Sequence, residues 1–211
     1  MRDRFARTAA RAALFLSLAV TGSILWLAGR GVTEPRYVPA SAPTEIVCEP
    51  TEAGFVRVVI LRSSEDAPCI DELEVYGDDP ARNLAQARDG ATATASSCLA
   101  GHAYHRVSHL NDGLYGNARS WIAATESPGE WAQVALPGTA RVARVVVSRD
   151  RRGEFSDRVP LWVDVMASPD GEAWTKIGEL RGEPAPAGWT AAGWSVAFRQ
   201  EHARQDRKSV V

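Results

Sequence analysis

The sequence has little of several features that mark particular protein classes. It contains three cysteines in 211 residues, and none forms a Cys-x-x-Cys pair, so neither a zinc site of that type nor a thioredoxin-like motif is indicated. The formal net charge is only −2, and no basic run lies beside aromatic residues, which gives no electrostatic reason to expect nucleic acid as a partner. G-x-S-x-G, H-E-x-x-H, P-loop and G-x-G-x-x-G patterns are also missing. No two carboxylates are marked out as a glycosidase pair, so enzymatic activity is not indicated.

Only one long apolar run is present, and it lies near the N-terminus. It extends over 17 residues from Ala12 to Ala28 and follows Arg2, Arg4, Arg7 and Arg11. Basic residues ahead of an apolar run keep the N-terminus in the cytoplasm and send the rest of the chain across the membrane. The run is long for the core of a cleaved signal peptide and at the short limit for a spanning helix. Residues 1–30 are therefore predicted to be a signal anchor or signal peptide, with the uncleaved anchor favoured on length.

The segment that follows is rich in proline. Residues 31–53 contain four prolines together with Thr, Ser and Ala, and they show no apolar period. Such a composition predicts an extended stalk between the membrane and a folded domain. The folded part would then lie in the cell envelope, outside the cytoplasm, as a single-pass membrane-anchored or a secreted protein.

The rest of the sequence predicts an all-β domain over residues 54–199, followed by a charged tail over 200–211. Short β-branched or alternating runs occur at 55–61, 73–76, 131–136, 142–147, 161–166 and 174–180. Segments containing Gly, Pro or Asp separate them, and no 3.6-residue apolar period appears after residue 30. This pattern is typical of a β-sandwich or barrel and excludes a helical bundle.

Several of these segments, in order, resemble the discoidin domain, also called the coagulation factor V/VIII C-type domain. They are Asn83-Leu-Ala85, Ala93-Thr-Ala-Ser-Ser97, His109-Leu-Asn-Asp-Gly113, Ser120-Trp121, Trp131-Ala-Gln-Val-Ala-Leu136, Val145 to Arg149 and Ser168-Pro-Asp-Gly-Glu-Ala-Trp174. The resemblance implies a jelly-roll β-sandwich of the galactose-binding-like type, which family 32 carbohydrate-binding modules share. It also implies a non-catalytic binding role and places Trp121, Trp131 and Trp174 in the core.

The order of the segments departs from the family pattern at one point. Residues 55–61 and the sequence Glu72-Leu-Glu-Val-Tyr-Gly77 resemble the last strand of the family, but here they precede Asn83. Either a second, truncated domain ends at Gly77, or the domain is circularly permuted. Because only about 25 residues lie between the stalk and Gly77, too few for a separate core, permutation is favoured.

The same resemblance implies a structural calcium ion. The turn around Asn111-Asp112-Gly113 is rich in oxygen atoms, which Ca²⁺ prefers as ligands. The side chains expected to bind the ion are Asp112, Asn117, Ser120 and Glu72. The alternative is an Asx-type turn that needs no metal.

Two segments, 102–106 and 149–158, are dense in side chains that bind ligands. Guanidinium groups engage vicinal hydroxyls or carboxylates, and aromatic rings stack on the apolar side of a sugar. Family 32 modules bind sugar from loops at one end of the sandwich. The predicted ligand residues are His102, Tyr104, His105, Arg149, Arg152, Phe155 and Arg158. The alternative for each arginine is an ordinary ion pair within a solvated loop, because Asp and Glu residues alternate with them.

The expected function is therefore binding of a glycan or glycoconjugate by an extracytoplasmic module. An adhesion or protein-interaction domain of the cell envelope is the main alternative; phospholipid binding and hydrolysis are less favoured. Contact with the membrane is expected through the N-terminal helix only. Outside the cytoplasm three cysteines allow one disulfide, for which Cys69 and Cys98 are the favoured pair, and three unpaired buried cysteines are the alternative.

Overall fold

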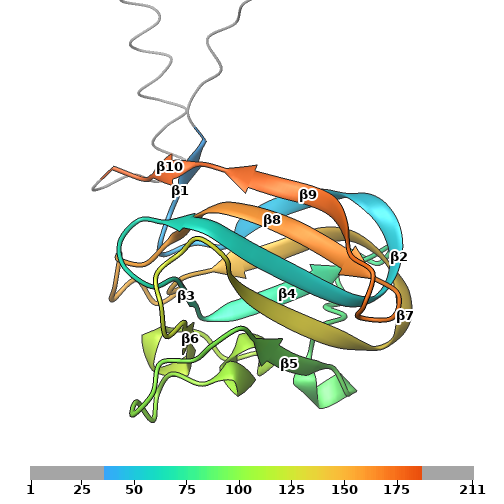
Figure 1. Ribbon diagram of the computed structural model, residues 1–211, viewed down its shortest axis with the longest axis horizontal. Helices are drawn as coiled ribbons and strands as arrows, with labels where there is room; N and C mark the ends of the chain where they lie inside the picture. Colours follow the sequence, from blue (N-terminus) through green and yellow to red (C-terminus); the bar gives the residue numbers. More distant parts are fainter. Residues whose placement is uncertain (1–35, 187–211) are drawn as a thin grey trace, which may run out of the picture. The chain divides into compact units, whose positions relative to one another are not determined.

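The computed structural model of the chain describes residues 36–186, and everything below concerns that range (Figure 1). The predicted N-terminal anchor or signal segment and the predicted charged tail lie outside the described residues. Within residues 36–186 no helix is long and apolar enough to span a bilayer.

The described part of the chain is built almost entirely from β-strands. The strands are β1 (Tyr37–Val38), β2 (Thr44–Ser63), β3 (Cys69–Ile70), β4 (Glu72–Tyr76), β5 (Thr92–Ala95), β6 (Trp121–Ile122), β7 (Glu130–Ser148), β8 (Pro160–Ser168), β9 (Thr175–Arg181) and β10 (Glu183–Pro184). Three 3-10 turns, η1 (Ala87–Asp89), η2 (Val107–Asn111) and η3 (Asn117–Arg119), lie in the connections. The expectation of a mostly β, antiparallel fold is confirmed.

The two longest strands, β2 and β7, form the centre of the fold as one antiparallel pair. The first part of β2, residues 44–47, pairs with residues 144–147 of β7, and the later part, residues 55–60, pairs with residues 130–135. The register shifts twice between these parts, and such bulges bend a strand. Figure 1 shows β2 curving around one side of the molecule.

The remaining strands extend this pair in two directions. β8 pairs with the later part of β2, and β9 pairs with β8. On the other strand of the central pair, β5 pairs with the early part of β7 and β4 pairs with its late part. The bent β2 therefore returns over β9: a Cβ placed on Gly178 would lie 3.1 Å from the Sγ atom of Cys48. This close approach of two layers is what a β-sandwich requires.

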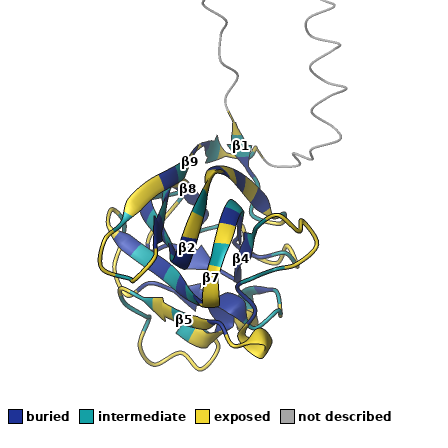
Figure 2. Cartoon of the chain, turned by 90° about the vertical axis from the view of Figure 1, so that its right-hand side faces the viewer, coloured by how far each residue is buried: buried dark blue, intermediate teal, exposed yellow. Residues whose placement is uncertain are grey.

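Alternation along the strands supplies the core between the layers. Successive side chains of a strand point to opposite faces, so every second residue is buried. On β2 the buried residues include Ile46, Val56, Val58 and Ile60, and β8 contributes Leu161, Val163 and Val165. Figure 2 shows this alternation as dark-blue and lighter segments along β7 and its neighbours.

The structure corrects the predicted domain boundary. The stalk predicted for residues 31–53 is wrong from Thr44 onward, because residues 44–53 belong to β2 and bury Ile46, Cys48 and Ala53. The prolines of this stretch suggested an unpaired segment. Pro39 and Pro43 lie outside the strands, before β2 begins, and Pro50 lies within β2, so the alternating Ile46 and Cys48 are free to pack. The folded part therefore begins before residue 54.

The early strands exclude one of the two explanations of the segment order. β2 pairs with β7 and β8, and β4 pairs with β7, so both belong to the same sheet as the later strands. A separate truncated domain ending at Gly77 is thereby excluded, and the circular permutation stays a prediction.

Of the three tryptophans expected in the core, only one is buried there. Trp121 is fully buried. Trp131 and Trp174 are only half-buried and lie on either side of the Arg57 guanidinium, whose central carbon is 4.2 Å and 4.0 Å from their ring centroids. They belong to the outer face of the sheet, where a guanidinium stacks between two indoles, so placing them in the core was wrong.

The predicted disulfide is not formed. Cys48, Cys69 and Cys98 are all free thiols. The Sγ atom of Cys98 donates a hydrogen bond to the carbonyl of His105 at 3.4 Å. Cys69 is fully buried, and burial raises the pKa of its thiol to about 11, so it stays protonated.

Two substitutions on β2 test how this strand contributes to the core. Ile60→Ala removes a fully buried side chain and is expected to lower the free energy of unfolding by about 2–5 kcal/mol. Val47→Ala, on the same strand but 80% exposed, is the matched control and should change it by no more than about 0.5 kcal/mol. Urea unfolding of both variants measures the difference; equal losses would contradict the assignment of the two positions.

Candidate functional site

The two segments predicted to bind ligand come together at one place in the structure. The Nδ1 atom of His105 is 3.0 Å from the Oγ atom of Ser120, and the rings of His102 and His105 lie 5.8 Å apart. Burial lowers the pKa of His105, and the nearby charges of His102, Arg149 and Arg158 lower it further. The segment 102–106 therefore lies beside the loop that joins β7 to β8.

Arg149, however, is not presented to a ligand. Its side chain is 1% exposed, and its guanidinium donates to the Asp157 carbonyl at 2.7 Å, the Asp157 carboxylate at 2.6 Å and the Asn117 amide oxygen at 3.1 Å. A guanidinium that is already bonded on three sides and covered serves to hold the two loops together. The prediction of Arg149 as a ligand contact is thus wrong for this conformation.

The side chains around Arg149 are more accessible. Phe155 is 45% exposed, and its ring centroid lies 5.8 Å from the Arg149 guanidinium carbon. Arg158 is half-buried and pairs with Asp66 at 3.3 Å and with Asp157 at 3.2 Å. Tyr104 is 66% exposed. We call the surface formed by His102, Tyr104, His105, Phe155 and Arg158 the loop face.

A buried aspartate gives the β7–β8 loop its shape. Asp150 is fully buried, and its carboxylate accepts hydrogen bonds from the backbone N–H groups of Arg152 at 3.1 Å, Glu154 at 3.0 Å and Phe155 at 2.9 Å. These bonds hold the loop so that Phe155 points outward. The exposed Arg152 instead packs toward Gly116, where a Cβ would lie 2.6 Å from its Cδ atom, and no contact places it on the loop face.

A second buried aspartate joins this loop to the 112–119 loop. Asp71 is fully buried and accepts hydrogen bonds from the backbone N–H groups of Gly116 at 3.0 Å and Arg151 at 2.9 Å, and also from the Ser148 hydroxyl. One carboxylate at the start of β4 therefore positions both loops. The sequence analysis did not single out Asp71, which has no motif of its own.

The four residues expected to bind calcium separate into two groups. The Glu72 carboxylate accepts a hydrogen bond from the Gly113 N–H at 3.1 Å, next to Asp112. Asn117 and Ser120 instead contact Arg149 and His105. Within residues 36–186 no three His, Cys, Asp or Glu side chains are grouped to hold a metal. Glu72 and Asp112 fit one side of a cation site, whereas Asn117 and Ser120 do not join them.

Glu72 is nonetheless an unusual carboxylate. It is fully buried, and burial raises its pKa to about 9, while the Asp112 and Glu74 carboxylates add to the rise and the Gly113 N–H opposes it. The carboxyl group is therefore protonated at neutral pH unless a cation compensates its charge.

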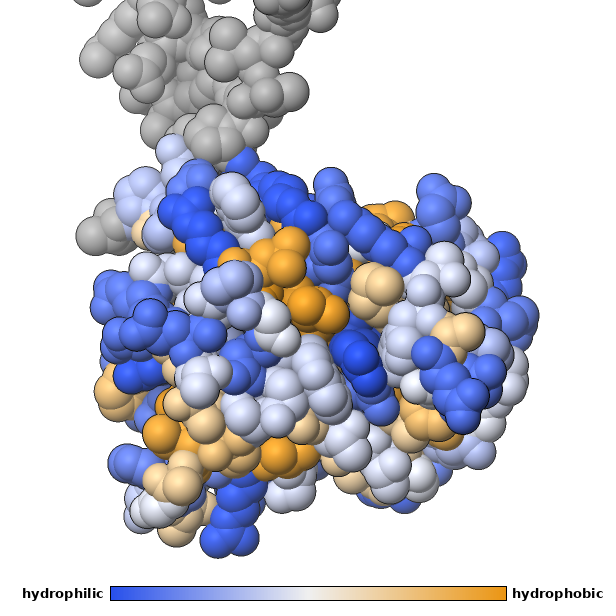
Figure 3. Space-filling view, viewed as in Figure 1, coloured by the Kyte–Doolittle hydropathy of each residue, from blue (hydrophilic) through white to orange (hydrophobic). Residues whose placement is uncertain are grey.

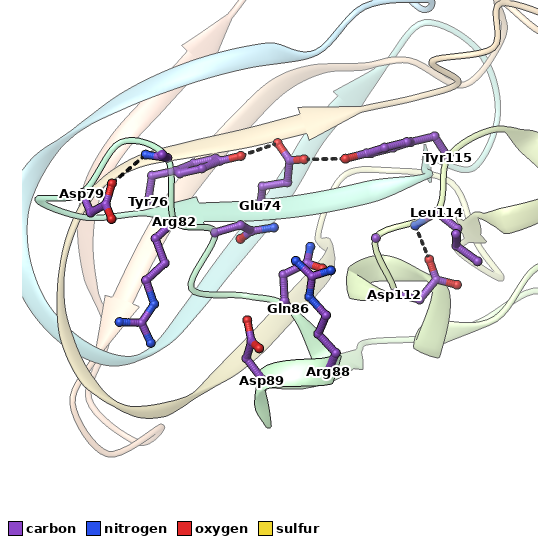
Figure 4. A pocket seen from close by; sticks show the side chains of 13 residues that line it. Glu74, Tyr76, Asp79, Arg82, Gln86, Arg88, Asp89, Asp112, Leu114 and Tyr115 are labelled. Atoms are coloured by element: carbon purple, nitrogen blue, oxygen red, sulfur yellow. Dashed lines mark hydrogen bonds between the residues drawn. The ribbon is translucent and has the colours of Figure 1, made fainter.

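A hollow beside β4 was missed by the sequence analysis. It has a volume of about 630 Å³ and is bordered by β4, η1 with its preceding turn, and the 112–115 loop (Figure 4). We call it the β4 pocket. Its lining residues are Glu74, Tyr76, Asp79, Ala81, Arg82, Asn83, Gln86, Arg88, Asp89, Asp112, Gly113, Leu114 and Tyr115. These residues are spread over 42 positions from 74 to 115, and no sequence spacing groups them.

Together, the bent two-layer sheet and the polar loops that join its strands define a protein of the β-sandwich class. Comparison with protein families gives the F5/8 type C domain over residues 92–199, which is more than half of the chain. The chain belongs to the F5/8 type C, or discoidin, family, and its domain is a non-catalytic binding module. Comparisons with the curated proteins and with the solved structures give no match.

The raised pKa of Glu72 predicts a pH dependence of stability. Between about pH 4.5 and about pH 9 the unfolded chain releases this proton while the folded protein keeps it, so the free energy of unfolding should fall as pH rises through that window. Glu72→Gln, which carries no titrating proton, should flatten the dependence. Thermal unfolding across this range in EDTA measures it; the same slope in both proteins would assign the pH dependence to other groups.

Proposed function

We propose that this discoidin domain binds carbohydrate through the loop face. The observation that carries the proposal is the approach of the His102–His105 segment to the β7–β8 loop. His105 lies near enough to Arg149 and Arg158 for their charges to lower its pKa, and each of the two segments carries an exposed aromatic ring. Imidazole and guanidinium groups hydrogen-bond sugar hydroxyls, and an exposed ring stacks on the apolar side of a pyranose. Phe155 and Tyr104 supply such rings.

The loop face is held in place before any ligand binds. Asp150 shapes the β7–β8 loop, and Asp71 and Arg149 join that loop to the 112–119 loop. The hydrogen bond between His105 and Ser120 then holds the 102–106 segment. Prior ordering lowers the entropy that binding would otherwise cost. Arg149 thus supports the loop face from beneath, and Phe155 lies over it.

The distribution of apolar surface favours a sugar over a lipid bilayer. The large hydrophobic residues that are exposed within the described range are Val47, Tyr104, Leu114, Phe155 and Trp162, and they come from different strands and loops. On the face of the molecule that Figure 3 displays, the hydrophobic patches are separated by hydrophilic side chains. Insertion into a membrane requires adjacent apolar tips, which the described loops do not gather. An adhesion contact with an envelope protein is the alternative proposal.

The location proposed for the domain is the extracytoplasmic side of the cell envelope. It is supported by the arginine-flanked apolar run at residues 12–28, which favours export of the chain that follows.

Two substitutions test the loop face. Phe155→Ala and His105→Ala should each weaken binding to the recognised polysaccharide about tenfold or more, because each removes a contact group from the centre of the surface. Glu126→Ala, at an exposed position that is not one of the loop-face residues, is the control. Binding is measured by affinity electrophoresis on a polysaccharide panel. Unchanged mobility of both folded variants on every polysaccharide that retards the wild type would refute the assignment of the surface.

We also propose that a calcium ion binds beside Glu72 and Asp112. The proposal is supported by a buried carboxylate with a raised pKa that has no ion pair within residues 36–186 and that accepts a hydrogen bond from the 112–115 loop. Backbone carbonyls of that loop would supply further oxygen ligands. Such an ion would compensate the charge of Glu72 and hold the 112–115 loop against β4.

Calcium binding to the folded state should raise the midpoint of thermal unfolding at pH 7.5, and EDTA should reverse the rise. Glu72→Gln should abolish the shift, and Asp112→Asn should reduce it. Magnesium at the same concentration is the control for ionic strength. A midpoint that is the same with calcium and with EDTA would mean that the loop is held by the Glu72–Gly113 hydrogen bonds alone.

A further inference from the structure

The β4 pocket is separate from the loop face. None of the loop-face residues lines it, and its lining comes from β4, the 79–89 segment and the 112–115 loop. Its volume of about 630 Å³ lies within the range of small-molecule sites, which is roughly 300–1,000 Å³. It is therefore large enough to hold a small ligand of its own.

The floor of the pocket is a fixed polar surface. Glu74 has a side chain only 7% exposed, and its two carboxylate oxygens accept hydrogen bonds from the hydroxyls of Tyr115 at 3.1 Å and Tyr76 at 3.3 Å. Figure 4 shows the two tyrosines reaching this carboxylate from opposite sides. Because each tyrosine hydroxyl donates its hydrogen bond to Glu74, its oxygen can still accept a hydrogen bond from a ligand.

Two arginines hold the tyrosine rings in place. Arg151 lies 4.2 Å from the Tyr115 ring centroid and pairs with Glu74 at 3.1 Å, and Arg144 lies 4.1 Å from the Tyr76 ring centroid. The Tyr–Glu–Tyr row is therefore ordered in the absence of a ligand, which favours recognition.

The opposite wall offers free hydrogen-bonding groups. Arg88 and Asp89 are exposed on η1, and neither side chain makes a hydrogen bond or ion pair within residues 36–186. Figure 4 shows both side chains extending from η1 beside Gln86. Asp112 and Leu114 close the third side, and Leu114, 47% exposed, adds an apolar edge.

The mixture of these groups indicates the class of ligand. The lining carries acceptors on Asp89, Asp112 and the tyrosine oxygens together with guanidinium donors, so charges of both signs alternate around one hollow. A carboxylate ligand would meet the aspartates, and an ammonium ligand would meet the arginines. A neutral hydroxyl both donates and accepts, and it satisfies either kind of group.

We propose that the β4 pocket is a second carbohydrate site, which takes one neutral pyranose unit between the Tyr–Glu–Tyr row and the Arg88–Asp89 wall. The inference deepens the proposed function, on which its ligand class rests. Two separate sites on one domain would let a polysaccharide bind at both and gain affinity without any new contact.

The test uses the full chain, labelled with ¹⁵N-glycine, in a detergent whose headgroup is not a sugar. The amide of Gly113 reports on the β4 pocket, because Gly113 lines it, and the amide of Gly153 reports on the β7–β8 loop. The probes are glucose, galactose and N-acetylglucosamine, with glucuronate and glucosamine as the charged comparisons. The pocket variant is Arg88→Ala with Asp89→Ala, the loop-face variant is Phe155→Ala, and Glu126→Ala is the control.

The expected result is a saturable shift of Gly113 with a neutral sugar. The pocket variant should raise the apparent Kd at Gly113 about tenfold, since it removes a donor and an acceptor, and should leave the Gly153 titration unchanged. Phe155→Ala should raise the apparent Kd at Gly153 and leave the Gly113 titration unchanged. Tyr115→Phe, which keeps the ring but loses the hydroxyl, should also weaken the Gly113 response.

Three results would overturn the inference. Saturation at Gly153 without any saturable shift at Gly113 would leave the proposed function intact and remove the pocket. A Gly113 response that only glucuronate or glucosamine produces would exclude the neutral ligand. A Gly113 response lost in Phe155→Ala and retained in the pocket variant would show a single site at the loop face. Conversely, saturation at Gly113 alone would support the pocket and refute the loop face.

Discussion

The pairing of β2 with β7 is the interaction on which the rest of the domain depends. These strands are long enough to pass through both layers, and register shifts between Val47 and Phe55 let them bend. Every other principal strand attaches to one of them or to β8, which itself pairs with β2. The bend therefore sets the distance between layers, the close approach of Gly178 to Cys48, and the places where loops emerge. Without it the buried face of β9 would have no partner.

Two buried carboxylates fix the loops that this frame carries. Asp71 joins the 112–119 loop to the β7–β8 loop, and Asp150 shapes the latter by accepting three backbone N–H bonds. Burying a carboxylate is unfavourable unless its oxygens accept hydrogen bonds. If one of these loops moved without the other, a buried carboxylate would lose hydrogen bonds and the folded state would be destabilised. Two arginines that are two residues apart link the β7–β8 loop to different partners: Arg149 donates to Asn117 and lies near Phe155 of the loop face, and Arg151 pairs with Glu74 of the β4 pocket.

The outcome for individual residues shows why the site was harder to predict than the fold. The run 55–61 is apolar and β-branched and the run 161–166 alternates with a period of two, both of which are typical of strands, and they lie within β2 and β8 as expected. Arg149 looked like a ligand contact because arginine recognises hydroxyls and carboxylates. Its neighbours Asp157 and Asn117 satisfy it first, and this preference depends on a loop conformation that residue types do not encode. The β4 pocket had no sequence signal, because its walls come from segments that meet only after β4 pairs with β7.

By itself the sequence determined that the domain is mostly β and that it resembles the discoidin family. Alternation and turn residues are local properties, and the family segments are recognised by their order along the chain. Only the tertiary structure decided that folding begins before residue 54, that Trp131 and Trp174 hold Arg57 on an outer face, that Cys69 and Cys98 are unpaired, and which polar side chains are buried. Each of these depends on which strands become neighbours, and that is settled by packing between residues distant in the chain.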